Sequence, residues 1–379
     1  MRILLWFSRL LFGLVFIFSG FVKAIDPLGS AYKFQDYFLA FGTEWLFFSA
    51  VPMAIILSTL EIVIGIAVLL GIKMRVSAWG GLLFMAFFTP LTLYIAITDP
   101  VPDCGCFGDA IIISNWDTFY KNIFILAAAI IVFIYRDKVK PLWSEKGDNI
   151  LLGGLSAASI ALSAYCLLYL PIIDFRPWKP GNNISELVIP IPEVAQTYLI
   201  FEHNETGETE EHPANDYPWD DPEWMAQWSF KDQRREIISP AQEAEIENFY
   251  IEDEFGDDLT EFFFTKDEYW FMVVAHDLNR TRARAFTRKI TPLAAEAEKH
   301  GNTLIVLTGS SLDDIDEFRH AYQTPYPFYL SDEIELKTII RSNPGLLLLK
   351  DGVVIDKWPH RRIPEFETIR KKYLDTTTD

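Results

Sequence analysis

Two cysteines separated by one glycine, Cys104-Gly105-Cys106, are the clearest candidates for chemistry in this sequence. A thiolate exchanges with disulfides, so a neighbouring pair can alternate between a dithiol and a disulfide. A disulfide inside Cys-x-Cys would close a very small ring, and strain of that kind makes the bond easier to reduce, which favours an oxidant. Gly105 gives the backbone the freedom that this ring requires. The pair is therefore a redox candidate, and a structural disulfide or a metal half-site without its other ligands are the alternatives.

The charges near this pair act on the pKa of its thiols in opposite directions. Asp103 and Asp109 should raise the thiol pKa, unless Lys121 or a helix N-terminus offsets them. The third cysteine, Cys166, lies near the end of an apolar segment and is a candidate resolving thiol. A lone cysteine in a lipid-embedded helix also serves as a small apolar filler, which is the alternative role.

Five long apolar segments occupy the first half of the chain and must position these residues. About 20 mostly apolar residues cross a bilayer, and such segments are helical because lipid cannot satisfy free backbone groups. We therefore predict a multi-pass membrane protein, with a cleavable signal peptide at the first segment as the alternative. The predicted spans are residues 9–25, 45–72, 76–97, 119–135 and 150–170.

Glu61 lies in the middle of the second predicted span. An ionisable group at that depth costs a few kcal/mol or more, so a function is the first hypothesis. Glu61 is a candidate for relaying protons or contacting a quinone. The alternative is a neutral carboxylic acid that helps the helices pack, with Ser58 or Thr59 as local partners.

The distribution of lysine and arginine predicts the orientation of the spans. Basic residues precede the first span and fill the connections between the second and third spans and between the fourth and fifth. The cysteine loop and the chain after the fifth span then lie on the opposite side. This pattern predicts a cytoplasmic N-terminus and a C-terminal domain on the opposite side of the membrane. The basic residues are Arg2, Arg9, Lys73, Arg75, Arg136, Lys138, Lys140 and Lys146.

The overall composition excludes several classes of protein. The chain has 379 residues, and its 33 basic and 52 acidic residues give a formal net charge of −19. That charge argues against nucleic-acid binding, which needs a basic face. Hydrophobic residues make up 50%, which excludes intrinsic disorder, and three cysteines are too few for a disulfide-stapled scaffold.

The last third of the chain predicts a soluble α/β domain. Strands are expected at 270–275, 304–307, 327–330, 346–349 and 353–356, and helices at 279–300, 311–322, 333–341 and 363–374. This order, with Asn343-Pro344 before the third long strand, resembles the thioredoxin fold, in which that proline is cis and lines the substrate groove. The redox Cys-x-x-Cys is missing, since the segment after the first core strand reads Ala275-His276-Asp277-Leu278-Asn279-Arg280. We expect a binding or structural domain with His276 and Pro344 at a partner groove.

The membrane half also carries a family resemblance. Phe16-x-x-Ser19-Gly20-x-x-Lys23-x-x-Asp26-Pro27, Glu61, and Asp103-Cys104-Gly105-Cys106-Phe107-Gly108-Asp109 followed by Trp116, Lys121 and Asn122 resemble the DoxX-like membrane proteins. Within these, residues 9–135 look most like the methylamine-utilisation protein MauE, and the whole arrangement looks like DoxX-family proteins of Bacteroidetes. The resemblance implies a four-helix bundle in the energy-transducing membrane. MauE is associated with maturation of a disulfide-rich periplasmic enzyme, and DoxX with quinone-linked oxidation of a sulfur compound.

These observations predict four regions. Residues 1–140 form a DoxX/MauE-like four-helix transmembrane domain, 141–180 a fifth span and linker, 181–246 an acidic connecting region, and 247–379 the thioredoxin-like domain. The leading hypothesis is thiol–disulfide chemistry or maturation of an exported client protein, with Cys104, Cys106 and Glu61 as catalytic candidates and quinone as a candidate acceptor. The first alternative is a non-enzymatic scaffold or accessory subunit in the lipid bilayer whose tail binds a partner. A small transporter built around Glu61 is a further alternative.

Overall fold

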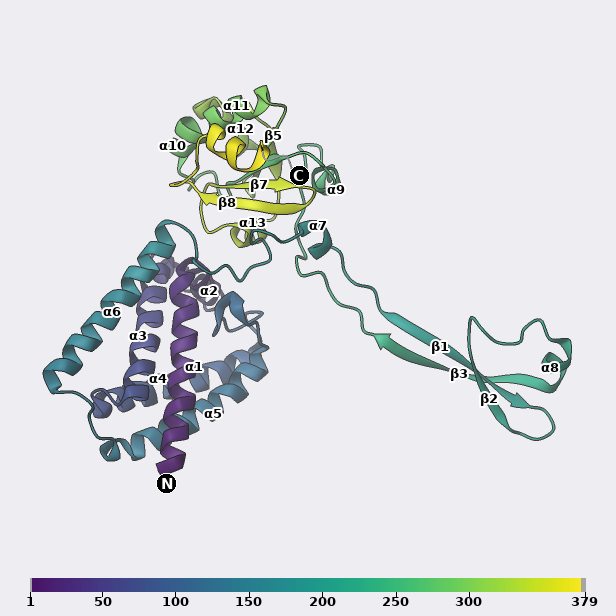
Figure 1. Ribbon diagram of the computed structural model, residues 1–379, viewed down its shortest axis with the longest axis horizontal. Helices are drawn as coiled ribbons and strands as arrows, with labels where there is room; N and C mark the ends of the chain where they lie inside the picture. The colour runs from purple at the N-terminus through teal and green to yellow at the C-terminus, as the bar shows by residue number, and fades with distance from the viewer. Residues whose placement is uncertain (1, 376–379) are drawn as a thin grey trace.

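A computed structural model describes residues 2–375 and contains five helices that are long and apolar enough to cross a membrane (Figure 1). They overlap the five predicted spans one to one, so the prediction of five long apolar helices is confirmed. Their bounds are α1 Arg2–Ile25, the 3₁₀ turn η1 Glu44–Ser49 continuing into α3 Ala50–Leu70, α4 Met74–Thr98, α5 Asn115–Ile134 and α6 Glu145–Leu168.

A further helix, α2 Pro27–Ala40, fills most of the connection between α1 and α3, which the sequence analysis treats as a loop. Asp26 caps this helix, because its side chain accepts a hydrogen bond from the backbone N–H of Gly29. Pro27 occupies the first turn of the helix, where a backbone N–H would have no hydrogen-bond partner within the helix, so the N–H that proline lacks is not needed. Helix α2 is too short and too polar to cross a membrane, but it brings Lys33 and Tyr37 to the cysteine loop.

Helices α1 and α3 approach each other at glycines. A Cβ atom on Gly20 would lie 2.7 Å from the carbonyl oxygen of Ser58 and 2.8 Å from the backbone nitrogen of Ile62. Small residues allow such contact between helix backbones in membranes. This close approach sets Lys23, one turn after Gly20, opposite Glu61 on α3.

The buried core of the membrane part draws on α1, α3, α4 and α5. The rings of Phe12 and Phe16 stack with 4.0 Å between their centroids. The Phe12 ring also packs against α4 at Gly81, where there is no side chain in the way. Helix α6 lies alongside α3, joined by a 3.2 Å hydrogen bond between the Thr59 and Ser159 hydroxyls.

The C-terminal part is a five-stranded mixed sheet with the order β6-β5-β4-β7-β8. Strands β4 and β5 pair in parallel, whereas β4 with β7 and β7 with β8 pair antiparallel. This order is that of the thioredoxin fold, which the sequence analysis predicts. The strands are β4 Trp270–Val274, β5 Thr303–Thr308, β6 Phe328–Leu330, β7 Gly345–Lys350 and β8 Val353–Pro359.

Helices cover both faces of this sheet. The helix predicted from residue 279 begins at Ala283, because residues 276–282 form the turn that leaves β4. Ser311 and Asp314 form a reciprocal capping box at the start of α12. The helical segments are α9 Thr260–Phe264, α10 Ala283–Ala285, η4 Phe286–Ile290, α11 Thr291–Lys299, α12 Leu312–Tyr322, α13 Glu333–Ile339, α14 Phe366–Ile369 and η5 Arg370–Leu374.

Two features of this domain bear on the site. The Asn343–Pro344 peptide bond is cis, as predicted. Trp178 and Ile184, from the segments that the sequence analysis assigns to the linker and the connecting region, are fully buried in the same core as Trp270 and Leu347. The exit from α6 is therefore packed against the C-terminal domain through these two side chains.

The acidic connecting region forms a separate antiparallel sheet with the order β2-β1-β3, which extends from the rest as a long arm (Figure 1). Trp224 packs edge-to-face on Phe201, with 4.8 Å between ring centroids, whereas Trp219 is exposed. The bounds are α7 Ile184–Leu187, β1 Val194–His203, β2 Thr209–Pro213, α8 Pro222–Gln227 and β3 Trp228–Ser239.

Candidate thiol site

Cys104, Cys106 and Glu61 line one cavity of about 90 Å³ between α1, α2, α3, α4 and α5. By a measure of about 10–15 Å³ per water, the cavity has room for several water molecules. Most of its wall is apolar, including the rings of Phe16, Phe34, Phe84, Phe88 and Phe107. The structure thus brings together the three residues that the sequence analysis proposes as catalytic candidates.

A buried ion pair forms the polar base of the cavity. The Lys23 ammonium lies 2.9 Å from one Glu61 carboxylate oxygen and 3.1 Å from the other, and both residues are less than a tenth exposed. Lys23 also donates to the Ser19 hydroxyl at 2.6 Å and to the Cys106 carbonyl at 2.7 Å. A charge pair inside a membrane is stabilised when its remaining donors and acceptors are satisfied, and here they are. Lys23 therefore ties Glu61 to the backbone of the cysteine loop.

The two thiols lie in contact and are not joined by a disulfide. Their sulfur atoms are 3.0 Å apart, which allows one thiol to donate a hydrogen bond to the other. With Cys104 as donor, this hydrogen bond lowers the pKa of Cys106 to about 6; burial opposes the shift, and Lys121 and Lys23 assist it. The same hydrogen bond, with burial, raises the pKa of Cys104. Cys106 therefore carries more of the thiolate form than Cys104 near neutral pH, and the thiolate is the reactive form of cysteine.

The two aspartates flanking the pair are neutralised by cations from elsewhere in the chain. Asp103 pairs with Lys33 of α2 at 2.5 Å, and Asp109 pairs with Arg341 of the C-terminal domain at 2.8 Å. Lys121 lies over the Phe107 ring at 4.2 Å and adds positive charge near the thiols. These pairs explain why two nearby carboxylates do not prevent a lowered pKa at Cys106.

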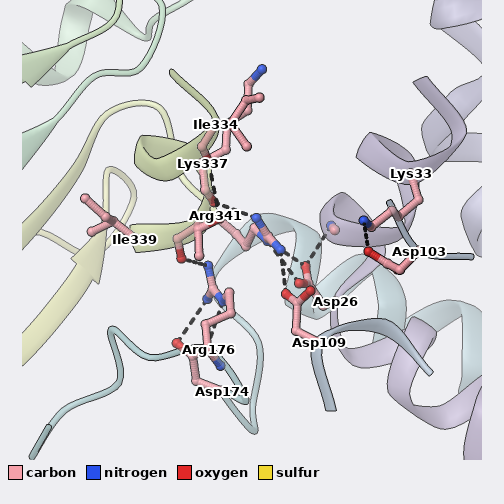
Figure 2. Close-up of polar contacts among 12 residues, drawn as sticks. Asp26, Lys33, Asp103, Asp109, Asp174, Arg176, Ile334, Lys337, Ile339 and Arg341 are labelled. Carbon is pink, nitrogen blue, oxygen red and sulfur yellow. Dashed lines mark hydrogen bonds and ion pairs between the residues drawn. The ribbon is translucent and has the colours of Figure 1, made fainter. Parts of the chain in front are cut away.

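Arg341 joins the C-terminal domain to the membrane part (Figure 2). Its guanidinium contacts Asp26 at 2.9 Å and Asp109 at 2.8 Å, and its side chain is 5% exposed. Arg341 and the neighbouring Lys337 also lie over the Tyr32 ring of α2, each at 5.4 Å. The cysteine loop and the C-terminal domain therefore lie at the same end of the bundle.

A second buried cluster supports this junction. Arg176, in the segment that leaves α6, pairs with Asp174 at 2.8 Å and donates to the Thr338 carbonyl at 2.8 Å (Figure 2). Lys357 of β8 also contacts Asp174. Burial, and after it the positive charge of Arg176, lower the pKa of Lys357 to about 8, while Asp174 opposes this shift. The linker is thus held to the domain at the face that meets the membrane part.

The remaining candidates lie away from the thiol cavity. Cys166 is buried on α6 and is not among the residues lining the cavity that holds Cys104 and Cys106. His276 follows β4 and lies 3.9 Å from Glu333; burial is the main cause that lowers the pKa of His276 to about 4, so the ring is neutral at pH 7. The Asn343 amide donates to the Asp277 carbonyl at 2.8 Å, which brings the His276 segment beside the loop of Pro344.

Sequence reasoning missed four residues of this site: Lys23, Lys33, Tyr37 and Arg341. Lys23 carried a usable signal, because a lysine near the end of one span and a glutamate within the next are natural partners. Lys33 and Tyr37 depend on α2, and the Tyr37 hydroxyl donates to the Cys104 carbonyl at 3.0 Å. Arg341 lies more than 200 residues after Asp109, and no local pattern links the two.

The Arg341 contact can be tested at a glycine beside it. A Cβ atom on Gly29 would lie 2.5 Å from the Asp26 carboxylate and 2.7 Å from the Arg341 guanidinium. We expect Gly29→Ala to cost about 1–3 kcal/mol, as overpacking does, measured by chemical unfolding in detergent. Gly153→Ala is the matched control, because Gly153 lies in α6 with open space around it and alanine favours helices. Equal stability of the two variants would contradict the contact.

Fold and site together define a class: a multi-pass membrane protein with a thioredoxin-like C-terminal region and a thiol pair at the junction of the two parts. Residues 1–135 match the family model described as Methylamine utilisation protein MauE, so this part of the chain is similar to that family. The predicted MauE resemblance is thereby confirmed. No curated protein matches the chain.

Three solved structures are similar to parts of the chain. A hypothetical protein from Sinorhizobium meliloti is 13% identical, with a TM-score of 0.24, over 28% of this chain and 63% of that one, just under two thirds of its length. A cysteine mutant of Xylella fastidiosa PrxQ is 11% identical, with a TM-score of 0.24, over 33% and 86%. A thioredoxin-like protein from Bacteroides caccae is 10% identical, with a TM-score of 0.24, over 88% and 83%. The assignment of the C-terminal fold rests on its own strand order.

Proposed function

We propose that this protein is a membrane thiol–disulfide oxidoreductase that acts on exported proteins through Cys104 and Cys106. The observation that carries the proposal is the shared cavity, in which the sulfur pair lies with Glu61 and Lys23. The cytoplasmic N-terminus and the bacterial inner membrane belong to the same proposal, as does the relation to DoxX proteins of Bacteroidetes. The basic connections on the other side of the bundle support this orientation.

The proposed exchange transfers two electrons. In the disulfide form of the pair, a thiolate of the client attacks the Cys106 sulfur, the Cys104–Cys106 bond breaks, and a mixed disulfide forms. A second client thiolate then attacks the client sulfur of the mixed disulfide and releases Cys106. The client leaves with a disulfide, and the pair is left as a dithiol, the form seen here. Two electrons have moved from client to pair.

The pair must then be oxidised again, and a membrane quinone is the proposed acceptor. It would take two electrons and two protons and become a quinol, while Cys104 and Cys106 form a disulfide. The aromatic wall of the cavity suits an apolar ring, and Lys121, which also lines the cavity, offers polar hydrogens. Glu61 and Lys23 remain paired throughout and fix the loop that carries Cys106.

The proposal is tested by trapping the pair in native membranes. Under oxidising conditions alkylation should be blocked at both Cys104 and Cys106, and reduction should expose both. Cys104→Ser should reduce exchange to background, because Cys106 then has no disulfide bond for a client thiolate to attack. Non-reducing electrophoresis of the client measures its disulfides. Cys166→Ser is the control and should leave exchange unchanged. If Cys104→Ser leaves the disulfides of every exported client intact, the proposal fails.

The pKa of Cys106 gives a second test. Because its pKa is lowered to about 6, alkylation should stay near its maximum at pH 7 and fall to about half near pH 6 as the thiolate is protonated. An ordinary thiol, with a pKa near 8.5, would already be mostly protonated at pH 7. Lys121→Met should move the profile to higher pH, because it removes a nearby positive charge. Rates from mass spectrometry measure the profile, and a midpoint above pH 8 in the unaltered protein would contradict the assignment.

The alternative is a non-enzymatic scaffold whose C-terminal region binds a partner. The projecting arm favours it, since Trp219 and Phe230 are exposed on a sheet that extends away from the rest of the chain. The scaffold predicts that deletion of residues 180–379 abolishes function whereas a double change of Cys104 and Cys106 to serine does not. The oxidoreductase predicts loss of function from the double cysteine change.

A further inference from the structure

A groove on the C-terminal domain gathers positive charge in a protein whose formal net charge is −19. Its volume is about 420 Å³, and no acidic residue lines it. Four of its cations are exposed arginines, and Lys289 is half-buried. We call this the basic groove; it is lined by Arg282, Arg284, Ala285, Arg288, Lys289, His360 and Arg361.

The cations of the basic groove have no carboxylate partner in the part of the chain that the structure describes. Among residues 2–375, no ion pair joins any of these five cations to a carboxylate, and Lys289 donates instead to the Arg361 carbonyl at 2.9 Å. Cations just outside the groove are paired: Arg280 with Asp277 at 3.3 Å, and Arg370 with Glu367 at 2.9 Å. Acidic residues therefore pair with cations just outside the groove but not with those that line it. An unpaired cluster of guanidinium groups suits phosphate, which arginine binds through two parallel hydrogen bonds.

The height of the basic groove relative to the membrane follows from its neighbour, Arg362. The Arg362 guanidinium lies over the Tyr169 ring at 3.9 Å and over the Tyr165 ring at 5.8 Å. These tyrosines lie at the end of α6, where aromatic residues of membrane proteins meet the lipid headgroups. Arg361 is the adjacent residue in the chain, with its Cα about 3.8 Å from that of Arg362, so the groove begins one residue from a side chain that reaches this level. Figure 1 shows α10, which carries Arg284, above this end of α6.

We propose that the basic groove binds the phosphate groups of anionic phospholipids at the membrane surface. The inference is independent of the thiol chemistry, because it requires only that α6 crosses the bilayer. Each lysine or arginine near an anionic surface strengthens binding, and five such cations in one groove form a polybasic site. Together with Arg341, lipid binding would hold the C-terminal domain against the membrane at a second point.

The test is native mass spectrometry of the full chain purified with equal amounts of phosphatidylglycerol and phosphatidylcholine. The unaltered protein should retain phosphatidylglycerol preferentially. The preference should fall by roughly fivefold for each groove cation removed, as in Arg284→Gln/Arg288→Gln. Arg319→Gln, an exposed arginine of the same domain outside the groove, is the matched control and should change nothing. Basic residues at the other end of the bundle contribute equally to all variants.

Three outcomes would overturn the proposal. One is an unchanged lipid ratio in Arg284→Gln/Arg288→Gln, with Arg361→Gln as a second variant should the first fold poorly. Another is loss of the preference in millimolar inorganic phosphate, which would assign the groove to a soluble anion. The third is dissociation of a dimer by the groove variant in lipid-free detergent, which would assign the groove to an acidic protein surface.

Discussion

Lys23→Met is expected to destabilise the membrane part by about 3 kcal/mol. It leaves the Glu61 carboxylate buried without its cation, and breaking a buried ion pair by removing one partner costs about 3–5 kcal/mol. The lower end of that range applies because unfolded membrane helices also find polar partners. The midpoint of chemical unfolding in detergent measures the effect. Stability equal to that of the unaltered protein would mean that the pair at 2.9 Å does not form.

The double variant Lys23→Met/Glu61→Leu separates stability from the position of the cysteine loop. Two apolar side chains of suitable size should recover most of the lost stability, because no charge remains buried. Exchange at the cysteines should stay impaired, since the Cys106 carbonyl has lost the donor that Lys23 provides at 2.7 Å. Recovery of both properties would show that Lys23 acts only as the partner of Glu61.

Arg341→Met should release the C-terminal domain from the cysteine loop. It removes the single guanidinium that pairs with both Asp26 and Asp109. Asp109 is about a third exposed and partly screened by water, so we expect about 2–3 kcal/mol rather than the full cost of a buried pair. That is a roughly 30- to 150-fold increase in the undocked population. Hydroxyl-radical footprinting of Tyr32, which Arg341 and Lys337 cover, should rise accordingly.

Two variants control for the loss of Arg341. Arg341→Lys keeps the charge but not the planar fork that reaches two carboxylates, so it should be intermediate. Arg319→Met removes an exposed arginine from the same domain and should leave Tyr32 protected. Tyr217, on the distant arm, is the internal reference for the dose of radicals. Unchanged protection of Tyr32 in Arg341→Met would show that other contacts hold the two parts together.

The elements that consist of a clear run of apolar residues could be predicted from the sequence. The five spans are long apolar runs, and β4, β5 and β7 are short apolar runs buried on both faces, so hydrophobicity alone reveals them. Helix α2 was missed because it is short and mixed in polarity, and it is held by contacts with other parts of the chain. The start at Ala283 was missed because residues 279–282 are all polar, so no apolar pattern marks where the helix begins.

The candidate site shows the same division. Two cysteines separated by one residue, and a glutamate within a predicted span, can be recognised as candidates from the sequence alone. Each is an unusual residue for its surroundings, and a short stretch of sequence is enough to show this. Their meeting in one cavity depends on glycines that let α1 and α3 touch, and on α2, which supplies Lys33 and Tyr37. The pKa of Cys106 depends in part on Lys121 and Lys23. How close these two side chains lie to the Cys106 sulfur cannot be inferred from their positions in the sequence.

The amino-acid sequence by itself determined that this is a membrane protein with five spans, a Cys-x-Cys pair and an α/β domain that lacks its own cysteines. Hydrophobicity, periodicity and residue type are properties of short windows, so one sequence is enough to read them. Only the tertiary structure decided that Glu61 pairs with Lys23 and that Arg341 joins the C-terminal domain to the loop of the thiols. Those contacts span 38 and 232 residues and depend on how helices and domains pack, which no short window contains.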